Sequence, residues 1–383
     1  MKKNPKVLYV IDTLEESGAE RSLLEITSKF SQIDPVFVHL YKGDSLKNEF
    51  IQKGIPTYSL NLSGSWNFKE AEQKLAEIYR KEQPDIIHST LFRSDLVTRR
   101  LKKVFPEVPL ISSFVNNSYH PMRFKQSGLG LRIKLKFIQK IDTVSSKKVD
   151  YFISNSNTIK QAKAKATNVP LDKIKVIPRG RDLSRFNGDI SNGGTTSLRK
   201  ELKAENKKIL LNVSRLIERK GQKDLIYAMP GILKAHPNTV LFIVGEGPFR
   251  TELESTIQKL NLENNVFLLG RREDVPELIS IADVFVFPSY FEGLPGALIE
   301  AMMGNLLISC SNIPENMECV NDKSAVIFKV GDISDISDKI NYAVTNESSL
   351  KHLREYARKT AENEFDIFRI AQKYEDFYFS INR

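Results

Sequence analysis

Two glutamates stand in one short segment, Glu292-Gly-Leu-Pro-Gly-Ala-Leu-Ile-Glu300, which follows an apolar run and leads into a helical pattern. Pro295 suits a first helical turn, where a missing N–H costs nothing. The amides of Gly293 and Leu294 would then lie at the end of the helix that attracts anions. The two carboxylates could accept hydrogen bonds from the hydroxyls of a sugar or a ribose. A helix cap followed by a solvated glutamate fits the same spacing.

Two cations follow another apolar run, in Ser214-Arg215-Leu-Ile-Glu-Arg-Lys220-Gly221. Arg215 offers a planar fork of donors and Lys220 a point charge, a combination that suits a diphosphate. The segment lies between an expected strand and an expected helix. Both cations would therefore stand at the carboxyl end of a strand, beside a helix N-terminus. A basic surface loop is the plainer interpretation.

Two glycine-containing segments also follow expected strands. In Glu16-Ser-Gly18-Ala-Glu-Arg21, Gly18 opens a helix and would let the backbone approach a ligand closely, although an ordinary helix start explains it too. Gly245-Glu-Gly-Pro-Phe-Arg250 imitates a dinucleotide fingerprint. Arg250 stands where the third glycine belongs, and the preceding strand is not the first of its domain, so the segment is weak support for NAD binding.

Several patterns of other chemistries are missing from the sequence. The five histidines form no pair at i, i+4 and have no cysteine near them, and no two aspartates stand two positions apart. There is no phosphate-binding P-loop and no Gly-x-Ser-x-Gly segment. Metal-dependent, P-loop and serine-hydrolase chemistries therefore lose support. The two cysteines, Cys310 and Cys319, cannot build a disulfide framework and are expected to be buried thiols.

The elements that must position these motifs follow from apolar runs that alternate with helical patterns. Strands are expected over 6–11, 36–40, 85–88, 110–114, 151–154 and 175–178, and then over 208–213, 239–244, 266–269, 284–287, 306–309 and 325–328. Helical crossovers between strands mean parallel pairing. The fold class is therefore α/β, with two Rossmann-like, doubly wound parallel-sheet domains facing a cleft, and ligands are expected at the carboxyl ends of the strands.

The domain bounds follow from composition. A polar stretch rich in Gly, Asn, Ser and Thr over 187–196 predicts a linker region, taken as 187–207, between domains of residues 1–186 and 208–364. Residues 350–379 read as one long helical pattern, whose last part, 365–383, we expect to cross back to the first domain. The basic start of the chain leads at once into a first strand with acids behind it. This pattern, together with the lack of a membrane-length apolar run, predicts a cytoplasmic protein.

Charge is distributed unevenly along the chain. The net charge of +10 divides into +14 for residues 1–185 and −4 for residues 186–383. An anionic partner of the first half is therefore expected: nucleic acid, an anionic membrane surface or an acidic substrate. Residues 123–140 hold six cations and no acid, interleaved with apolar side chains. As a helix, this segment would place Arg132, Lys136 and Lys140 on one face and leucines and isoleucine on another, as on a membrane-surface helix. An ordinary domain helix with a solvated basic side is the alternative.

Taken in order, these segments resemble family 4 glycosyltransferases of the GT-B fold. The resemblance covers essentially the whole chain and is most specific in the second half. It rests on the following segments: Ser17-Gly-Ala-Glu-Arg21, Pro84-Asp-Ile-Ile-His88, Ser154-Asn-Ser156, Val176-Ile-Pro-Arg-Gly-Arg-Asp182, Ser214-Arg215 with Lys220-Gly221, Val244-Gly-Glu-Gly-Pro248 and Phe291-Glu-Gly-Leu-Pro-Gly-Ala-Leu-Ile-Glu-Ala-Met302. It implies a nucleotide-sugar donor (UDP- or GDP-linked) on the second domain, an acceptor on the first, retention at the anomeric carbon, and neither metal nor other cofactor.

The resemblance also implies roles for single residues. Arg215 and Lys220 would clamp the diphosphate. Glu292 would hold the donor sugar, and Glu300 the ribose hydroxyls. The catalytic candidates are Glu292, Arg215 and Lys220.

Further contacts are implied around this centre. The backbone amides of Gly293 and Leu294 would face the sugar or phosphate, Gly18 would approach the donor from the other domain, and Arg271 would border the base. His88 and Asn116 are the candidates on the acceptor side, and Arg132, Lys136 and Lys140 are those for membrane contact.

The sequence departs from the family pattern in two places. Many relatives carry a His after the strand that corresponds to 110–114; here the stretch is Phe114-Val-Asn-Asn117, and Asn116 is the available substitute. The segment before Asp182 commonly holds Asn-Gly, whereas this chain has Arg179-Gly-Arg181.

The leading interpretation is a glycosyltransferase that acts on a cell-surface glycan or lipid-linked acceptor, at the inner face of the cytoplasmic membrane. A sugar-nucleotide epimerase or phosphorylase on the same architecture is the alternative enzyme. A basic nucleic-acid-binding module is the non-enzymatic alternative, but no nucleic-acid motif appears in the sequence, so nucleic acid is not expected as a partner.

Overall fold

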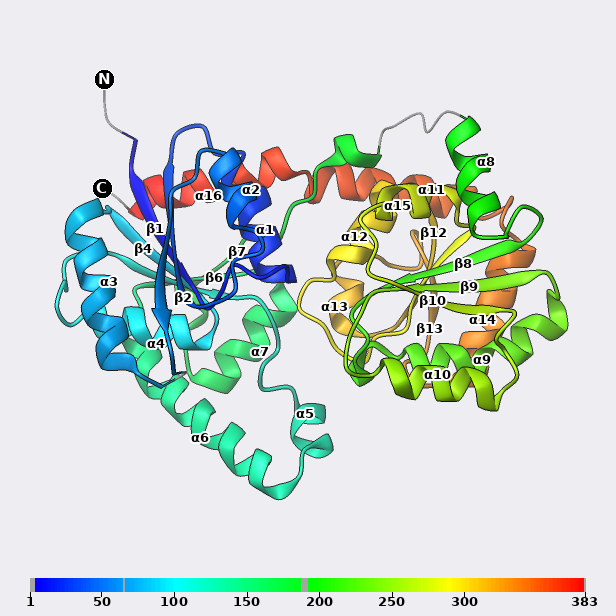
Figure 1. Ribbon diagram of the computed structural model, residues 1–383, viewed down its shortest axis with the longest axis horizontal. Coiled ribbons are helices and arrows are strands. Elements are labelled where there is room, and N and C mark those ends of the chain that lie inside the picture. The colour runs from blue at the N-terminus through cyan, green and yellow to red at the C-terminus, as the bar shows by residue number, and fades with distance from the viewer. Residues whose placement is uncertain (1–3, 65, 187–191, 382–383) are drawn as a thin grey trace. The chain divides into compact units, whose positions relative to one another are not determined.

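The computed structural model describes residues 4–64, 66–186 and 192–381 (Figure 1). The chain forms two compact units: unit 1 takes residues 1–180 and 367–383, and unit 2 takes residues 181–366. The part of the expected linker that falls on 187–191 lies outside the described residues.

The described part of unit 1 is built on one sheet of seven parallel strands, ordered β3-β2-β1-β4-β5-β6-β7. The strands are β1 (Lys6–Ile11), β2 (Asp34–Tyr41), β3 (Thr57–Leu62), β4 (Ile86–Thr90), β5 (Leu110–Phe114), β6 (Tyr151–Ser154) and β7 (Ile174–Val176). Most of these strands are buried apolar runs, as expected where helices cover both faces of a parallel sheet. The strand order reverses between β1 and β4, which are paired directly.

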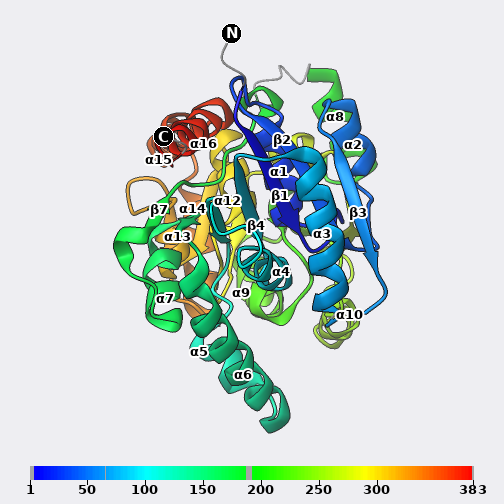
Figure 2. The same ribbon diagram turned by 90° about the vertical axis from the view of Figure 1, so that its left-hand side faces the viewer.

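Helices cover the two faces of this sheet over two separate apolar clusters. They are α1 (Gly18–Thr27), α2 (Lys47–Gln52), α3 (Phe68–Glu82), α4 (Phe92–Leu101), α5 (Pro121–Gln126), α6 (Leu129–Ser145), α7 (Asn157–Thr167) and α16 (Ile367–Ile381), with 3₁₀ turns at Ser146–Lys148 and Leu171–Lys173. The last helix, α16, packs against α1, and the hydroxyls of Tyr9 and Tyr378 are hydrogen-bonded at 2.5 Å. Figures 1 and 2 show α6 extending beyond the sheet of unit 1.

The described part of unit 2 has a sheet of six parallel strands, ordered β10-β9-β8-β11-β12-β13. The strands are β8 (Lys208–Val213), β9 (Thr239–Val244), β10 (Val266–Gly270), β11 (Val284–Phe287), β12 (Leu307–Ser311) and β13 (Val326–Phe328). The helices are α8 (Asn192–Glu201), α9 (Gln222–Ala235), α10 (Arg250–Lys259), α11 (Val275–Ile281), α12 (Gly296–Met303), α13 (Pro314–Met317), α14 (Ile333–Thr345) and α15 (Lys351–Glu364), with 3₁₀ turns at Leu183–Phe186 and Glu218–Lys220.

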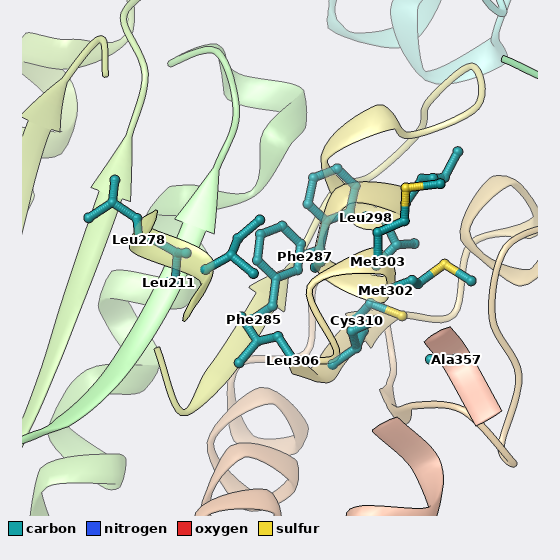
Figure 3. Packing of buried hydrophobic residues seen from close by; sticks show 14 of the residues in the cluster. Leu211, Leu278, Phe285, Phe287, Leu298, Met302, Met303, Leu306, Cys310 and Ala357 are labelled. Carbon is teal, nitrogen blue, oxygen red and sulfur yellow. The ribbon is translucent and has the colours of Figure 1, made fainter. Parts of the chain in front are cut away.

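One apolar cluster fixes α12 on the sheet of unit 2. Figure 3 shows Leu298 and Met303 of α12 beside Phe287 of β11, with Cys310 of β12 close by. All four side chains are at most 1% exposed. The helix that carries Glu300 is therefore held rigidly against the strand that leads to Glu292. Both cysteines are buried and free, as the sequence predicted.

Three sequence expectations need correction. Strand β3 was missed because it is an edge strand in which polar and apolar residues are mixed. Residues 192–201 of the expected linker form helix α8, whose Leu198 is buried in the apolar core of unit 2. The single helix expected over 350–379 is two helices, interrupted at Phe365–Asp366, where Asp366 pairs with Arg181 in a short bridge. Among the described residues, no helix combines the length and apolar character needed to span a bilayer.

Candidate active site

The donor-side motifs of unit 2 meet at the point where the strand order reverses. Strands β8 and β11 are neighbours in the centre of the sheet. The Arg215–Lys220 segment follows β8, and Glu292 follows β11. The chain leaves these two strands in opposite directions, and the carboxyl ends of the strands at such a reversal are the usual ligand position in sheets of this kind.

Glu292 and Lys220 form the centre of this site. The carboxylate of Glu292 is 6% exposed and is ion-paired with the ammonium of Lys220. Burial would raise the pKa of Glu292, but the charges of Lys220 and Arg219 outweigh it and lower that pKa. Glu292 is therefore a buried carboxylate that stays ionised at neutral pH.

Arg219 is the residue that sequence reasoning missed. One guanidinium nitrogen lies 3.3 Å from the second carboxylate oxygen of Glu292 and donates to the carbonyl of Phe291 at 2.7 Å. Its position next to Lys220 was the available signal. However, the sequence does not show which of the three cations in this loop contacts Glu292.

Backbone contacts hold the two loops together. The amide of Tyr290 donates to the carbonyl of Arg219 at 2.8 Å. Gly221 has a φ of +70°, and a Cβ on it would lie 2.1 Å from the carbonyl oxygen of Pro288. The buried amide of Gln222 donates to the carbonyl of Arg215 at 2.9 Å. Gly221 is thus required by the close approach of the β8 loop to the β11 loop.

The Gly245-Glu-Gly247 segment has a supporting role in the same region. Gly245 has a φ of +138°, and a Cβ on it would lie 2.1 Å from the carbonyl oxygen of Ser214. The amide of Leu216 donates to the carbonyl of Glu246 at 3.0 Å. This segment therefore packs against the backbone of the Arg215 loop, which explains its glycines without a dinucleotide.

The amides of Gly293 and Leu294 lie just before α12. This helix begins at Gly296, with Pro295 as its N-cap, so Pro295 does not belong to the first turn as the sequence suggested. Within the described chain, the amides of Gly293 and Leu294 donate no hydrogen bond. They remain two donors near the positive end of the α12 dipole.

Glu300 is engaged by an arginine of its own unit. The Nε of Arg181 donates to Glu300 Oε1 at 2.6 Å, and the side chains of Arg181 and Glu300 are 8% and 19% exposed. In the sequence, Arg181 was identified only as part of a departure from the family pattern. The structure shows that its charge is paired with the carboxylate predicted to hold the ribose.

The two remaining cationic site candidates of unit 2, Arg215 and Arg271, form no hydrogen bond or ion pair with Glu292 or Glu300 in the described chain. Arg215 is exposed, and its side chain has no hydrogen bond or ion pair with the described residues. Arg271 directly follows β10 and is also exposed. Both residues follow the carboxyl ends of strands, as Lys220 and Glu292 do. Among the described residues, no group of three or more His, Cys, Asp or Glu side chains gathers as a metal site.

In unit 1, Gly18 and Asn116 both lie near carboxyl ends of strands. Gly18 is the first residue of α1, and a Cβ on it would lie 3.7 Å from a guanidinium nitrogen of Arg179, which is ordinary contact. Asn116 follows β5 and lines a cavity of about 420 Å³.

His88 does not belong with the acceptor-side candidates. It is fully buried, and its two ring nitrogens are hydrogen-bonded to the hydroxyls of Tyr378 and Ser113, both at 2.7 Å. Burial lowers its pKa to about 3, so the ring is neutral. We therefore correct its role: His88 joins β4 to α16 in the core of unit 1 and presents no ring nitrogen to an acceptor.

The basic segment 123–140 is not one helix as expected: it is divided between the end of α5 and most of α6, and the faces of α6 also differ from the expectation. Leu131, Leu135 and Ile138, expected as the apolar side of a membrane-surface helix, line the cavity of unit 1 together with Lys134. The outer face instead carries exposed cations beside a different exposed apolar set: Arg132, Lys136 and Lys140 beside Leu129, Ile133 and Phe137. The alternating pattern of the segment arises because both faces of α6 are apolar.

Comparisons with known proteins agree with this architecture. A model of "Glycosyltransferase Family 4" matches residues 17–185, and one of "Glycosyl transferases group 1" matches residues 195–360. The chain is 28% identical over 343 residues to the UDP-Gal:alpha-D-GlcNAc-diphosphoundecaprenol alpha-1,3-galactosyltransferase of Escherichia coli, covering 88% of this chain and 85% of the relative. It is 26% identical over 315 residues to spore coat protein SA of Bacillus subtilis, covering 79% and 80%.

Solved structures share the fold at low sequence identity. Anabaena HepE in complex with UDP and glucose superposes with a TM-score of 0.86 at 21% identity, covering 99% of this chain and all of HepE. WaaG, a glycosyltransferase of lipopolysaccharide biosynthesis, gives a TM-score of 0.76 at 18% identity, covering 97% and 99%. The two family models together match most of the chain, and each unit has the parallel sheet that this fold requires. The chain therefore belongs to glycosyltransferase family 4 and is a glycosyltransferase of the GT-B fold.

Proposed function

We propose that this glycosyltransferase moves a hexosyl group from a nucleotide-diphosphate sugar to a cell-surface glycan or lipid-linked acceptor, with retention at the anomeric carbon. The observation that carries the proposal is the buried Lys220–Glu292 ion pair at the reversal point of the unit 2 sheet. It combines a cation for a leaving diphosphate with a carboxylate for the sugar that departs from it.

The chemistry of the step matches these charges. The bond between the anomeric carbon and the diphosphate oxygen breaks, and the acceptor hydroxyl attacks the same face of the sugar. Its proton passes to the leaving diphosphate. Negative charge then grows on the diphosphate, where Lys220 and Arg215 would stabilise it, and positive charge grows on the sugar, next to the carboxylate of Glu292.

The remaining donor contacts follow from the same geometry. The amides of Gly293 and Leu294 would bind the sugar or the phosphate, and Glu300, held in place by Arg181, would accept hydrogen bonds from the ribose hydroxyls. Arg271 would border the base, and Gly18 would approach the donor from unit 1.

UDP is the favoured donor nucleotide. The Escherichia coli relative is named for UDP-Gal, and the HepE structures hold UDP, UDP with glucose and UDP-glucose. GDP-linked sugars are the second choice. Membership of a glycosyltransferase family speaks against an epimerase, a phosphorylase or a nucleic-acid-binding module as the main activity.

We further propose that transfer needs neither a metal ion nor another cofactor. In this proposal, the charge of the leaving diphosphate is met by Lys220, Arg215 and backbone amides, so a divalent cation has no task left in the site. Full activity in EDTA is the expected result. A strict requirement for Mg²⁺ or Mn²⁺ would overturn this part.

The outer face of α6 supports peripheral attachment to an anionic membrane, on the cytoplasmic side, where nucleotide sugars would be met. Arg132, Lys136 and Lys140 form one exposed stripe of this helix, and Leu129, Ile133 and Phe137 form the stripe beside it. A cationic stripe next to an apolar one is the arrangement by which a helix lies in a membrane surface.

A donor panel tests the proposed activity. The purified protein is incubated with UDP-, GDP- and ADP-sugars, and release of nucleoside diphosphate is measured with and without crude membrane lipids. We expect release with one nucleotide class and a one-hexose mass increase in a lipid or glycan fraction. The anomeric configuration of the product, read by NMR, should equal that of the donor. Absence of release from every donor, with membrane lipids present, would contradict the proposal.

A further inference from the structure

Unit 1 holds a cavity of about 420 Å³ that the donor chemistry leaves unassigned. Its floor is made by carboxyl ends of the central strands, with Asp12 after β1 and Ser113 and Phe114 at the end of β5. Helix α6 forms the opposite wall with Leu131, Lys134, Leu135 and Ile138. The cavity thus lies at the point where the strand order of unit 1 reverses, the usual ligand position of such a sheet.

Part of the cavity lining is apolar. Leu131, Leu135 and Ile138 come from successive turns of α6, and Phe114 and Tyr119 line the same cavity. Trp66 lines the cavity as well and is 49% exposed. A neutral, soluble glycan would leave the aliphatic part of this lining without a partner.

Much of the charged lining of the cavity is cationic. Two acids that line it, Asp95 and Asp142, are already paired with the buried Arg99, and Asp142 also lies 3.4 Å from Lys163. Outside these ion pairs, the cavity is lined by three further cations, Arg93, Arg123 and Lys134, and by one further acid, Asp12. Lys134 has no ion pair with any described residue, and among those residues the guanidinium of Arg123 donates only to the carbonyl of Ser118, at 3.1 Å. Three cations against one carboxylate favour an anionic ligand.

Asp12 is placed to hold a hydroxyl group. Its Oδ1 accepts hydrogen bonds from the amide and the hydroxyl of Ser94, at 3.0 and 2.7 Å. Its second oxygen accepts no hydrogen bond from the described residues. Burial raises the pKa of Asp12, while these bonds and the charge of Arg93 act against the rise. The carboxylate is thus fixed in orientation, with one oxygen left for a ligand.

We propose that this cavity binds the head of an amphiphilic acceptor, a sugar joined through a diphosphate to a lipid chain. Lys134, Arg93 and Arg123 hold the diphosphate, the α6 leucines and isoleucine cover the first part of the chain, and Asp12 accepts a hydrogen bond from a sugar hydroxyl. The assignment rests on the proposed transfer to a lipid-linked acceptor and narrows it to diphosphate-linked lipids. Helix α6 then has two tasks, with its inner face toward the acceptor head and its outer face toward the membrane.

The chain carries its own reporter of this cavity, because Trp66 is its one tryptophan. The probe is farnesyl diphosphate, which has the diphosphate and an isoprenyl chain but no sugar. Titration into the full-length protein should change the Trp66 fluorescence saturably. Farnesol and inorganic diphosphate, each with half of the chemistry, should bind at least roughly tenfold more weakly, since one charge-assisted contact is worth about that factor. UDP should not compete.

Two lysines of α6 allow an experiment to distinguish binding in the cavity from binding at the outer face of the helix. Lys134→Gln should weaken farnesyl diphosphate binding roughly tenfold. Lys136→Gln, with the same charge change two residues away on the outer face, should leave it unchanged. In turnover assays with a diphosphate-linked acceptor, Asp12→Asn should raise the acceptor KM and leave the donor KM and acceptor-independent donor hydrolysis as in the wild type. A residue needed only for folding would move all three.

The outcomes distinguish the two proposals. No Trp66 response to farnesyl diphosphate, or equal responses to farnesol or inorganic diphosphate, would overturn the assignment of the cavity. So would equal effects of Lys134→Gln and Lys136→Gln. If Trp66 responds as expected but no nucleotide sugar is ever cleaved, the cavity assignment stands and the proposed transfer fails.

Discussion

Lys220 of the loop after β8 and Glu292 of the loop after β11 form a direct, largely buried ion pair in unit 2. Their side chains are 12% and 6% exposed, so neither charge is well solvated. Each charge therefore depends on the other, and Lys220 has two connected tasks. It keeps Glu292 ionised, and it supplies the cation proposed to bind the diphosphate.

Replacement of this lysine should change both affinity and pH dependence. Lys220→Ala should weaken donor binding at least roughly tenfold, the value of a charge-assisted hydrogen bond. It should also let burial raise the pKa of Glu292, so the acid limb of the kcat/KM profile should move to higher pH. Lys220→Arg should rescue poorly. Lys223→Ala, which removes a lysine paired on the surface with Glu252, is the control and should change neither quantity.

Removal of the charge from Glu292 should affect catalysis more than stability. Glu292→Gln keeps the shape of the side chain, and we expect kcat to fall by roughly a hundredfold or more, as when a group that stabilises developing charge is lost. The largely buried Lys220 then loses the charge of Glu292, so some stability is lost too. The double variant Glu292→Gln, Lys220→Met removes both charges and should regain stability but not activity. Full activity of Glu292→Gln would show that this carboxylate only shapes the loop.

Glu300 should behave differently, because its partner is structural. Glu300→Gln should raise the donor KM with little change in kcat, since ribose contacts are alike in the ground and transition states. It also removes the charge of Glu300 from the largely buried ion pair with Arg181, which should lower the stability of the protein. Glu254→Gln removes an exposed glutamate paired with Arg250 and is the matched control for thermal unfolding. An unchanged melting temperature in Glu300→Gln would show that the Arg181 pair contributes little.

Much of the sheet framework could be predicted from the sequence because most central strands are continuous apolar runs between helical patterns. Strands β1, β8 and β11 are of this kind, and the donor motifs follow two of them directly. The edge strand β3 lacks such a run, since one of its sides meets no other strand. At the break between α15 and α16, the backbone of Asp366 forms a bridge with that of Arg181, a contact far apart in the sequence that no local pattern records.

The pairing of charges could not be predicted from the sequence. Arg181 and Glu300 are separated by 119 positions, and only the folded unit brings them together. Arg219 and Arg215 are both arginines of one loop, yet only Arg219 contacts Glu292. The same holds for the two apolar faces of α6. Helical periodicity predicts which residues share a face, but it does not show which face lines a cavity and which is exposed.

Buried His88 should make unit 1 sensitive to acid. Its pKa of about 3 in the folded chain lies below the ordinary value of 6.5, so the unfolded chain binds the proton first as pH falls. Stability should therefore decline from about pH 6.5 toward pH 3, by about 1.4 kcal/mol per pH unit from this group. Urea unfolding at neutral and mildly acidic pH, followed by Trp66 fluorescence, measures the slope. His88→Gln cannot titrate, and its shallower slope is the expected result; equal slopes would assign the acid sensitivity to carboxylates.

The last prediction concerns the outer face of α6. Arg132, Lys136 and Lys140 changed together to Gln should weaken binding to vesicles that contain anionic lipid by roughly two orders of magnitude, at about 1 kcal/mol per cation. Added salt should also weaken the binding of the wild type to these vesicles, because it screens the attraction between the cations and the anionic lipid. Phe137, 61% exposed, should contribute independently of salt, so Phe137→Gln should lower the binding that remains at high salt.

The control for this prediction uses three exposed lysines elsewhere on unit 1, Lys165, Lys173 and Lys175, whose replacement by Gln removes equal charge. That control triple should bind vesicles like the wild type if α6 is the contact. Equal losses in both triples would mean that the general charge of unit 1, and not α6, attracts the membrane.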